Sequence, residues 1–506
     1  MKWNFLIFLS IMVLPFTGMG QRVVYSDYDR DDSRDMNFEI IGKMNGNVLV
    51  YKNMKWKHRI MLYDGNMKTV STVNLDFFPE KTLNVDFVTY PDHFYMIYQY
   101  QKNRIVHCMG INMDANGNKL SEPVELDTTR LPNFDDNKIY STIVSEDKQK
   151  IMVFKIQKKS EKISFVTLLF DNKLKLINKT RQTLNFDNRT DNYREFLLDN
   201  EGNFVFTFDR EPINRDYSNG LKLGIKAPLQ DTFSFQTIDL ENKFINDVSI
   251  KIDNLNKKYL LNAFYYLKNR GSVEGVLTYI WDVWGQKKYT INFTSFDEAL
   301  RTEARRDGSH KIAFDEYYIR QAIVKKDGGF LLLAEDYSSQ SRINNNSQSN
   351  RWDYYNNPYM YSPNSYYYYN PYYGGYYYRP ISSFNNQNTR YFYDNLMVMS
   401  INRYGQPEWQ KIIQKNQVDD DDDNFLSYAT FNSGGEIHFL FNMDSKNQII
   451  TDQSIAADGS IKRNATLRSQ EKGYQFMTRL SKQVGARELL VPCLYRGFIC
   501  FAKVDF

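Results

Sequence analysis

The residue types that perform most enzymatic chemistry are scarce in this sequence. Only five histidines occur among its 506 residues: His58, His93, His107, His310 and His438. A hydrolytic triad needs a histidine as general base, and no Gly-x-Ser-x-Gly nucleophile turn accompanies any of the five. The His-Glu-x-x-His spacing of zinc proteases, the Gly-x-Gly-x-x-Gly turn and the phosphate-binding P-loop are also missing from the sequence. We therefore expect neither a catalytic motif nor a cofactor.

Pairs of carboxylates are the remaining route to catalysis, because glycosidases use two acidic side chains about 5 to 10 Å apart. Acidic residues precede the first strand of several of the repeats described below. Four of them would approach the same mouth of the fold, namely Asp191, Asp247, Asp315 and Glu316. Side-chain capping of the connecting turns explains the same residues, and the sequence favours that role.

Five consecutive aspartates at 419–423 form a dense run of negative charge. Carboxylate oxygens are the ligands that Ca²⁺ prefers, which makes Asp419, Asp421 and Asp423 the candidate metal ligands. Consecutive side chains point in different directions, however, and the spaced Asp-x-Asp-x-Asp-Gly pattern of a calcium loop is missing. The favoured interpretation is a solvated linker without a metal.

A low-complexity segment at about 338–394 is rich in tyrosine and asparagine. It lacks the aliphatic residues that a core needs, so it is predicted to be a loosely ordered insertion. Tyrosine combines a wide apolar ring with a terminal hydroxyl, which suits contacts with protein or sugar. The candidate binding residues are Tyr366, Tyr367, Tyr368, Tyr369, Tyr372, Tyr373, Tyr376, Tyr377 and Tyr378. A neutral expansion without a role is the alternative.

The elements that position these residues repeat along the chain. Short runs rich in Phe, Tyr, Val and Ile alternate with turns that carry Gly, Asn or Asp, a pattern typical of β-hairpins. One series of turns recurs about every 50 to 60 residues, with one double-length gap, at 64–66, 114–117, 171–173, 228–231, 282–285, 403–405 and 458–459. A second series lies between these turns, at 45–46, 147–148, 199–202, 253–256, 327–329 and 433–435. Two turns in each period imply four strands in each period.

Four-stranded sheets repeated around an axis are the blades of a β-propeller. Full sets of strands are predicted at 36–78, 82–126, 136–185, 192–240, 245–294, 313–413 and 424–467. The remainder, about 472–506, holds three strands, and residues 22–25 supply the fourth. We therefore predict one all-β propeller domain over 21–506 with eight blades. A ring of seven blades is the second choice, and a β-helix or two sandwiches come after it.

The sixth predicted blade shows the repeat most clearly. A strand at 396–402 is followed by the polar turn Tyr404-Gly405-Gln406 and by a strand that contains Trp409. This order of strand, polar turn and Trp-bearing strand resembles the propeller repeats of secreted bacterial proteins. The resemblance covers most of the chain. The resemblance implies the fold and no activity. The single Trp281-Asp282 dipeptide is similar to that of WD40 blades, but no other blade repeats it, so that family is not supported.

The N-terminus has the features of a signal peptide. Lys2 precedes an apolar stretch from Phe5 to Leu14 that is too short to span a bilayer. The small residues Gly18 and Gly20 provide a cleavage site, so residues 1–20 are predicted to be removed; a buried N-terminal strand is the alternative. The expected location is the periplasm, the outer membrane as an associated protein, or the cell exterior. No later segment is long and apolar enough to cross a membrane as a helix.

Charge and cysteine content exclude further classes. The formal net charge of +4 is small and both signs are interspersed, so we expect no nucleic-acid partner. Three cysteines cannot build a disulfide scaffold. Cys493 and Cys500 flank Arg496-Gly497, and a two-residue turn there would place them opposite each other. Either a disulfide or two buried thiols fits this arrangement.

The predicted connections differ between the two faces of the propeller. Turns between the first and second strands, and between the third and fourth, are tight, whereas the connections on the other face include the long ones. Variable loops on a rigid scaffold usually hold binding groups. The leading hypothesis is a non-catalytic binding or scaffold propeller that contacts an envelope protein or a glycan through its long-loop face. A carbohydrate-active enzyme with acidic residues at the channel mouth is the alternative, and a surface-layer protein is the third.

Overall fold

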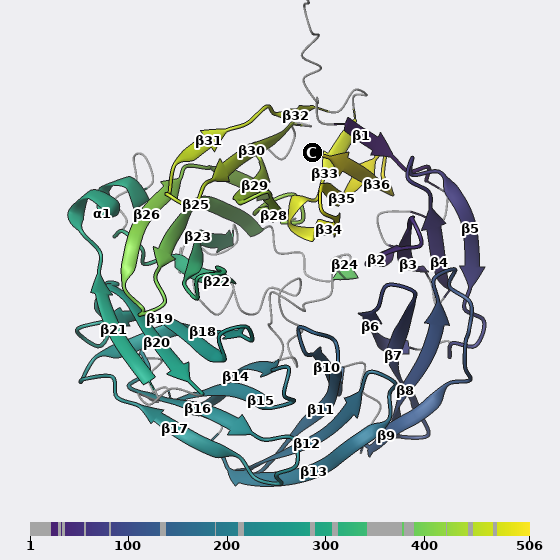
Figure 1. Ribbon diagram of the computed structural model, residues 1–506, viewed down its shortest axis with the longest axis horizontal. Coiled ribbons are helices and arrows are strands. Elements are labelled where there is room, and N and C mark those ends of the chain that lie inside the picture. Colours follow the sequence, from purple (N-terminus) through teal and green to yellow (C-terminus); the bar gives the residue numbers. More distant parts are fainter. Residues whose placement is uncertain are drawn as a thin grey trace, which may run out of the picture.

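Eight antiparallel sheets surround a central opening in the computed structural model (Figure 1). The structure describes residues 22–28, 32, 36–54, 57–79, 82–131, 138–187, 189–210, 217–283, 289–305, 312–341, 377–378, 389–420, 423–443, 449–468 and 473–506. Each sheet contains four strands that follow one another outward from the opening, and some sheets have an additional short strand. The protein is an eight-bladed β-propeller, which confirms the predicted fold class.

The first four blades follow one another without interruption. Blade I contains β2 (Asn37–Met44), β3 (Asn47–Met54), β4 (Lys57–Tyr63) and β5 (Thr69–Asn74). Blade II contains β6 (Thr82–Thr89), β7 (His93–Lys102), β8 (Ile105–Asp114) and β9 (Val124–Arg130). Blade III contains β10 (Tyr140–Val144), β11 (Lys150–Lys159), β12 (Lys162–Asp171) and β13 (Leu176–Asn185). Blade IV contains β14 (Asp191–Leu198), β15 (Phe204–Arg210), β16 (Gly220–Lys226) and β17 (Ser234–Ile238).

The last four blades carry the additional elements. Blade V contains β18 (Phe244–Asp253), β19 (Lys258–Tyr266), β20 (Gly275–Asp282) and β21 (Tyr289–Ser295), and the short helix α1 (Glu298–Ala304) follows it. Blade VI contains β22 (Tyr317–Val324), β23 (Phe330–Ser341), β25 (Thr389–Ile401) and β26 (Pro407–Ile413), and β27 (Gln417–Asp420) also pairs with β25. Blade VII contains β28 (Ala429–Ser433), β29 (Glu436–Asn442), β30 (Ile449–Ile455) and β31 (Ile461–Arg463), and β32 (Leu467–Arg468) also pairs with β30.

Blade VIII joins the two ends of the described chain. It contains β33 (Tyr474–Phe476), β35 (Glu488–Tyr495), β36 (Phe498–Asp505) and β1 (Arg22–Tyr25), together with β34 (Lys482–Gly485) and the 3₁₀ turn η1 (Thr478–Leu480). Arg22 lies opposite Asp505, and Tyr25 lies opposite Ala502. The predicted closure of the last blade by the N-terminal strand is confirmed.

A capped turn explains where the third and fourth strands of several blades meet. Asp64 Oδ1 accepts hydrogen bonds from the backbone N–H groups two and four residues later, at 2.8 and 2.9 Å. Asp114, Asp171 and Asn402 make the same pair of bonds. The residue three positions after each cap has a positive φ, and glycine, as at Gly117 (φ 79°), adopts this conformation without strain. The polar turns predicted from the sequence thus define the hairpins.

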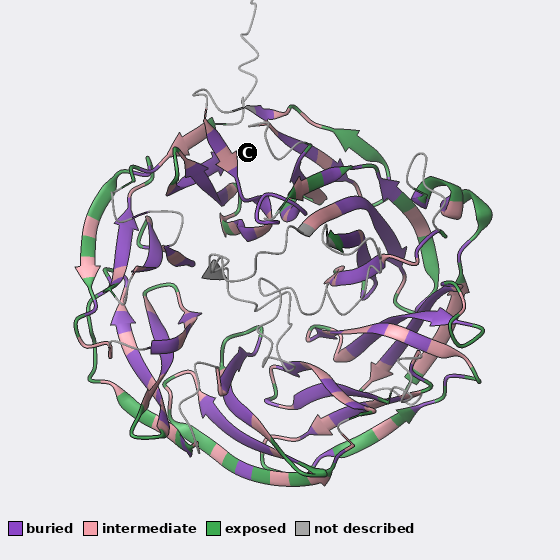
Figure 2. Ribbon diagram, turned by 180° about the vertical axis from the view of Figure 1, so that it is seen from behind, coloured by how far each residue is buried: buried purple, intermediate pink, exposed green. Residues whose placement is uncertain are grey.

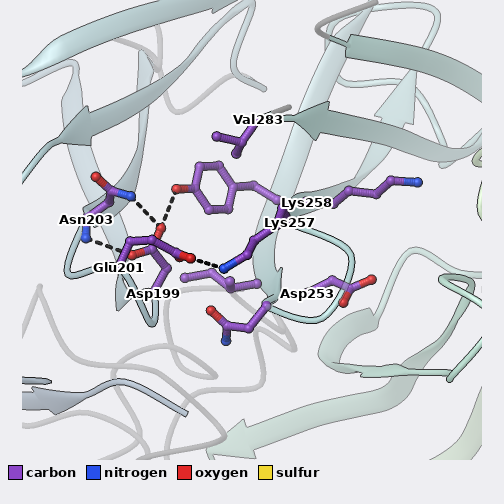
Figure 3. Close-up of a pocket in the computed structure, with 10 residues that line it drawn as sticks. Asp199, Glu201, Asn203, Asp253, Lys257, Lys258 and Val283 are labelled. Atoms are coloured by element: carbon purple, nitrogen blue, oxygen red, sulfur yellow. Dashed lines mark hydrogen bonds and ion pairs between the residues drawn. The ribbon is translucent and has the colours of Figure 1, made fainter. Parts of the chain in front are cut away.

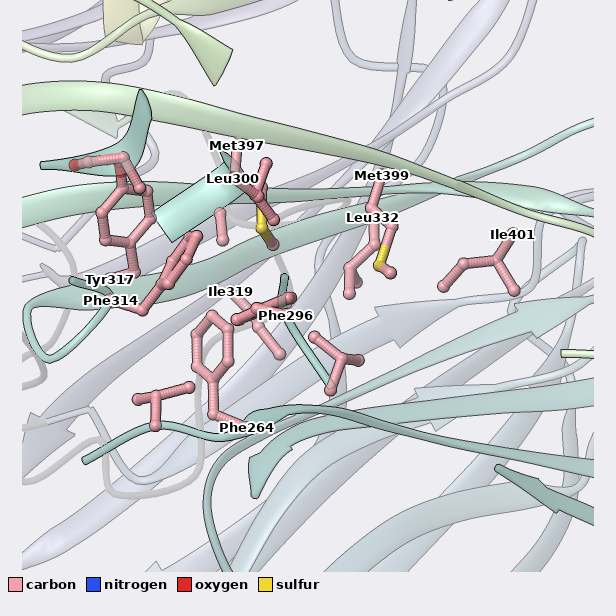
Figure 4. Packing of buried hydrophobic residues seen from close by; sticks show 14 of the residues in the cluster. Phe264, Phe296, Leu300, Phe314, Tyr317, Ile319, Leu332, Met397, Met399 and Ile401 are labelled. Carbon is pink, nitrogen blue, oxygen red and sulfur yellow. The ribbon is translucent and has the colours of Figure 1, made fainter. Parts of the chain in front are cut away.

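Apolar side chains fill the interfaces between neighbouring blades. Each of the eight interfaces contains at least one cluster of buried hydrophobic residues in the described part of the chain. Figure 4 shows the cluster between blades V and VI, where Phe264 and Phe296 pack with Leu332 and Met399. Figure 2 shows that exposure is concentrated on the outermost strands. Burial of apolar surface against both neighbours therefore holds each blade in the ring.

The long connections are not spread evenly around the ring. On the long-loop face, the second and third strands of blades I, II and III are joined by the short segments 55–56, 103–104 and 160–161. The corresponding segments of blades IV to VII are longer, at 211–219, 267–274, 342–388 and 443–448. The long connections between second and third strands are thus confined to four consecutive blades. Among the described residues, no helix is long and apolar enough to span a bilayer.

Candidate functional site

The carboxylate of Asp191 has a structural role. Asp191 is the first residue of β14, and its side chain is 5% exposed. It accepts a hydrogen bond from Arg210 Nε on β15 at 2.8 Å and one from the backbone N–H of Asp187 at 3.1 Å. These bonds fix the connection that enters blade IV, as capping predicts.

Asp247 links two blades through a bulge. It lies in β18 at the point where the register with β19 shifts, and it has a φ of 58°. Its buried carboxylate accepts a hydrogen bond from the backbone N–H of Ile319 on β22. Because β18 and β22 are the innermost strands of blades V and VI, Asp247 joins these two blades next to the central opening.

The other two predicted carboxylates precede β22 directly. Asp315 Oδ1 accepts a hydrogen bond from the backbone N–H of Val273 at 3.4 Å. The backbone carbonyl of Glu316 accepts one from Tyr337 at 2.9 Å. The contact of the Asp315 carboxylate, like those of Asp191 and Asp247, holds a connection in place, whereas the Glu316 contact is made by its backbone.

Two further glutamates lie on innermost strands and were missed by the sequence analysis. Glu195 occupies a bulge of β14 that matches the bulge of Asp247 in β18, with a φ of 57°. Its carboxyl group is hydrogen-bonded to the backbone of Ile250 on the next blade, and burial raises its pKa to about 8. Glu39 on β2 is 6% exposed, and burial raises its pKa to about 8 although the nearby Lys482 opposes this. Burial thus favours the protonated form of both carboxyl groups.

The surroundings of Glu39 bring together charges from three blades. Lys482 Nζ on β34 donates to the backbone carbonyls of Ile40 and Ile41 at 2.9 and 3.0 Å, and burial lowers its pKa to about 8. Asp86 on β6 pairs with Lys138 at 2.9 Å. A raised carboxyl pKa is one property of a general acid. Glu195 and Asp247 occupy equivalent bulges, and each is hydrogen-bonded to the backbone of the next blade. This arrangement indicates that these acidic side chains link neighbouring blades and do not act as general acids.

The tyrosine-rich insertion interrupts blade VI between β23 and β25. These strands run to 12 and 13 residues and pair as far as Ser341 and Thr389. Tyr377 and Tyr378 form β24, whose backbone pairs with that of Phe38 and Glu39 on β2, in the central opening (Figure 1). The other predicted binding residues lie outside the described part of the chain: Tyr366, Tyr367, Tyr368, Tyr369, Tyr372, Tyr373 and Tyr376. Their binding role stays a prediction.

The acidic run contributes an ion pair at its last residue. Asp423 is 1% exposed, and its two oxygens accept hydrogen bonds from Arg479 at 2.9 and 3.1 Å, while Tyr393 donates a third at 2.7 Å. Asp419 Oδ1 accepts a bond from the next backbone N–H at 2.8 Å. Asp421 lies outside the described residues. In the part of the chain that the structure describes, no group of three or more His, Cys, Asp and Glu side chains could hold a metal ion.

A small pocket opens on the tight-turn face between blades IV and V (Figure 3). Tyr259 donates a hydrogen bond to Asp199 at 2.7 Å, and Lys257 pairs with Glu201. The volume of the pocket is about 40 Å³, far below the several hundred Å³ of a small-molecule site. The hydrogen bond and the ion pair join the turns of the two neighbouring blades, so these side chains stabilise the turns.

The two C-terminal cysteines face each other as predicted. Cys493 on β35 and Cys500 on β36 are register partners across the Arg496-Gly497 turn, and their Sγ atoms are 3.0 Å apart. Both side chains are free thiols and fully buried. Burial raises the pKa of Cys493 well above its usual value.

Oxidised glutathione present during refolding is expected to join Cys493 and Cys500, while the same oxidant added after folding leaves both reduced. Thiol–disulfide exchange needs a thiolate that the oxidant can reach, and both side chains are fully buried in the folded blade, where burial also opposes ionisation of Cys493. Each bond formed removes two hydrogens from the protein and reduces one glutathione disulfide to two thiols. Alkylation followed by peptide mass spectrometry detects the linked pair. Rapid alkylation of either cysteine in the folded protein would contradict the expectation.

Comparisons with known proteins find only distant structural similarity. No protein-family model matches the chain, and no curated protein matches it. The WD40 domain of SCAP from fission yeast is 8% identical, with 96% of this chain and 98% of that chain covered and a TM-score of 0.39. Prolyl oligopeptidase B from Galerina marginata is 7% identical, with 92% of this chain and 56% of that chain covered and a TM-score of 0.41. The β-propeller domain of the Trilobed protease from Pyrococcus furiosus is 8% identical, with 83% and 95% covered and a TM-score of 0.35.

Proposed function

We propose that this protein is an exported, non-catalytic binding or scaffold propeller of the cell envelope or exterior. It contacts a protein or a glycan through the long-loop face of blades IV to VII. The observation that carries the proposal is the confinement of the long connections between second and third strands to these four blades of a closed ring. A rigid ring holds such loops at fixed positions, as binding scaffolds do.

The alternative of a carbohydrate-active enzyme has less support. It needs two carboxyl groups free to act on a sugar from opposite sides. Asp191 is engaged by Arg210, and Asp247 is engaged by the backbone of Ile319. These contacts suit a structural role of the carboxylates that the enzyme would use.

Replacing residues 342–388 by a short Gly-Ser turn is expected to abolish retention of the partner. This replacement leaves β23 and β25 intact, because they end at Ser341 and begin at Thr389. The experiment captures material from envelope and medium fractions on the intact protein and on the variant, and mass spectrometry and glycan analysis read the result. The matched control replaces residues 132–137, in the connection between blades II and III outside the proposed binding loops, by the same turn.

A partner held by the intact protein and by the control, but not by the 342–388 variant, supports the proposal. Equal capture by all three proteins, or specific capture by none, would contradict it. Thermal unfolding of each variant shows whether the ring is intact, since a damaged ring loses binding for another reason.

A further inference from the structure

Blade III has a larger formal positive charge than the chain as a whole. Between Tyr140 and Asn185 the sequence has ten lysines and arginines but four aspartates and glutamates, a formal net charge of +6, whereas the whole chain has +4. Eight of these ten basic side chains are exposed. Positive charge is therefore concentrated on this blade although the chain as a whole is nearly balanced.

The exposed basic residues gather along the outermost strand, β13, and the turn before it. Asp171 Oδ1 accepts hydrogen bonds from the backbone N–H groups of Lys173 and Lys175 at 2.9 Å each, which fixes this turn. Two residues of β13, Lys179 and Arg181, are exposed on the same side of the strand, since side chains two residues apart share a face. Positive charge thus follows the outer edge of the blade.

Aliphatic side chains lie within the same row of charges. The register between β12 and β13 shifts where Phe170 pairs with Leu176 and Leu169 with Asn178, so that Ile177 is an extra residue in β13. This bulge exposes two consecutive apolar side chains, Leu176 at 47% and Ile177 at 39%. They sit between the basic turn and the basic strand.

Protection of the sheet edge does not account for these charges. Lysine on an edge strand prevents pairing with other chains. The outermost strands of three other blades, β5, β17 and β21, contain neither lysine nor arginine. The ring therefore tolerates neutral outer edges, and the basic edge of blade III needs another explanation.

We propose that this basic rim, formed by Lys173, Lys175, Leu176, Ile177 and Arg181, binds the surface of an anionic lipid bilayer. Lysine and arginine are attracted to phosphate headgroups, and aliphatic side chains enter the boundary between headgroups and acyl chains. The exposed apolar groups here are aliphatic, and a sugar-binding surface would use aromatic rings instead. The outermost strand of a ring can touch an extended surface without rearrangement of the blades.

The test measures co-sedimentation of the mature protein with phosphatidylcholine vesicles that contain or lack phosphatidylglycerol. The triple variant K173Q/K175Q/R181Q is expected to lower the partition coefficient on anionic vesicles at least about tenfold. Lys179 is left unchanged because it pairs with Asp127 at 2.8 Å. The matched control K411Q/K462Q/R463Q removes the same number of exposed charges from blades VI and VII and is expected to change binding less than about twofold.

Binding should also weaken as sodium chloride is added, because salt screens the attraction. The proposal is overturned if the intact protein binds anionic and neutral vesicles equally, or if the triple variant and its control lose binding to the same extent. It is independent of the partner proposed above, because replacement of 342–388 should leave vesicle binding unchanged and the triple variant should keep the captured partner.

Discussion

Replacing Lys415 by methionine is expected to lower the free energy of unfolding by about 3–5 kcal/mol. Lys415 Nζ and Glu335 Oε1 are 2.8 Å apart, and both side chains are fully buried. The substitution leaves the Glu335 carboxylate in the interior, with Arg320 Nε at 3.4 Å and the Ser427 hydroxyl at 2.7 Å as other partners. Removing the nearer cation leaves this buried carboxylate only partly compensated, which costs much more than an unmade surface contact. The midpoint of urea unfolding checks the result.

Two further variants isolate the cause of that loss. Lys119 and Glu122 form an exposed pair at 2.9 Å, so Lys119→Met is expected to cost less than about 1 kcal/mol. The double variant Glu335→Gln with Lys415→Met removes both charges and should recover part of the stability lost by the single change. A loss in Lys415→Met no greater than that in Lys119→Met would mean that the buried pair is not a stability determinant.

The pair matters because it belongs to a chain of polar contacts across the last three blades. Lys415 Nζ also donates to Gln417 Oε1 at 2.9 Å, and the same oxygen accepts the backbone N–H of Ser427 at 2.9 Å. The Gln417 amide donates to the Asn442 carbonyl at 2.6 Å, and the Asn442 amide donates to the Phe476 carbonyl on β33 at 2.7 Å. Polar side chains thus fix the position of blade VIII, which closes the ring.

The fold could be predicted because its signals are local. Asp64 and Asp171 each cap the turn that follows within four residues, so the sequence contains the whole cause of the hairpin. The repetition of such turns then gives the blade period. The closing strand 22–25 was predictable for a related reason, because a three-stranded remainder needs one more strand.

The candidate sites could not be predicted to the same extent, because they depend on register and on neighbours from other blades. The sequence does not distinguish Glu195 from other strand residues, because its position depends on the bulge of β14. The bulge directs the side chain toward the next blade, where burial raises its pKa to about 8. The partner of Asp247 is the backbone of Ile319, 72 residues later in the chain. Likewise, Leu176 and Ile177 are both exposed only because of a bulge that the sequence does not reveal.

Replacing Glu195 by glutamine is expected to make the protein more stable than the unchanged protein at pH 9, with little difference at pH 5. Burial raises the pKa of Glu195 from 4.5 to about 8 in the folded protein, so the folded state keeps a proton that the unfolded state loses between these values. The stability that protonated Glu195 contributes is complete below about pH 4.5 and is lost as the pH rises through about 8.

Glutamine keeps the size and the hydrogen-bonding oxygen of Glu195 but cannot ionise, so it removes this loss. The Glu195 side chain keeps some contact with solvent, which reduces the stability effect below the value that the full pKa shift would give. We therefore expect a difference in the free energy of unfolding of about 2 kcal/mol at pH 9. Urea unfolding of both proteins from pH 5 to pH 9.5 measures it. Glu39 is present in both proteins, so its own raised pKa cancels in the difference. A difference that stays constant across this range would show that Glu195 is not the group whose ionisation destabilises the inner strands at high pH.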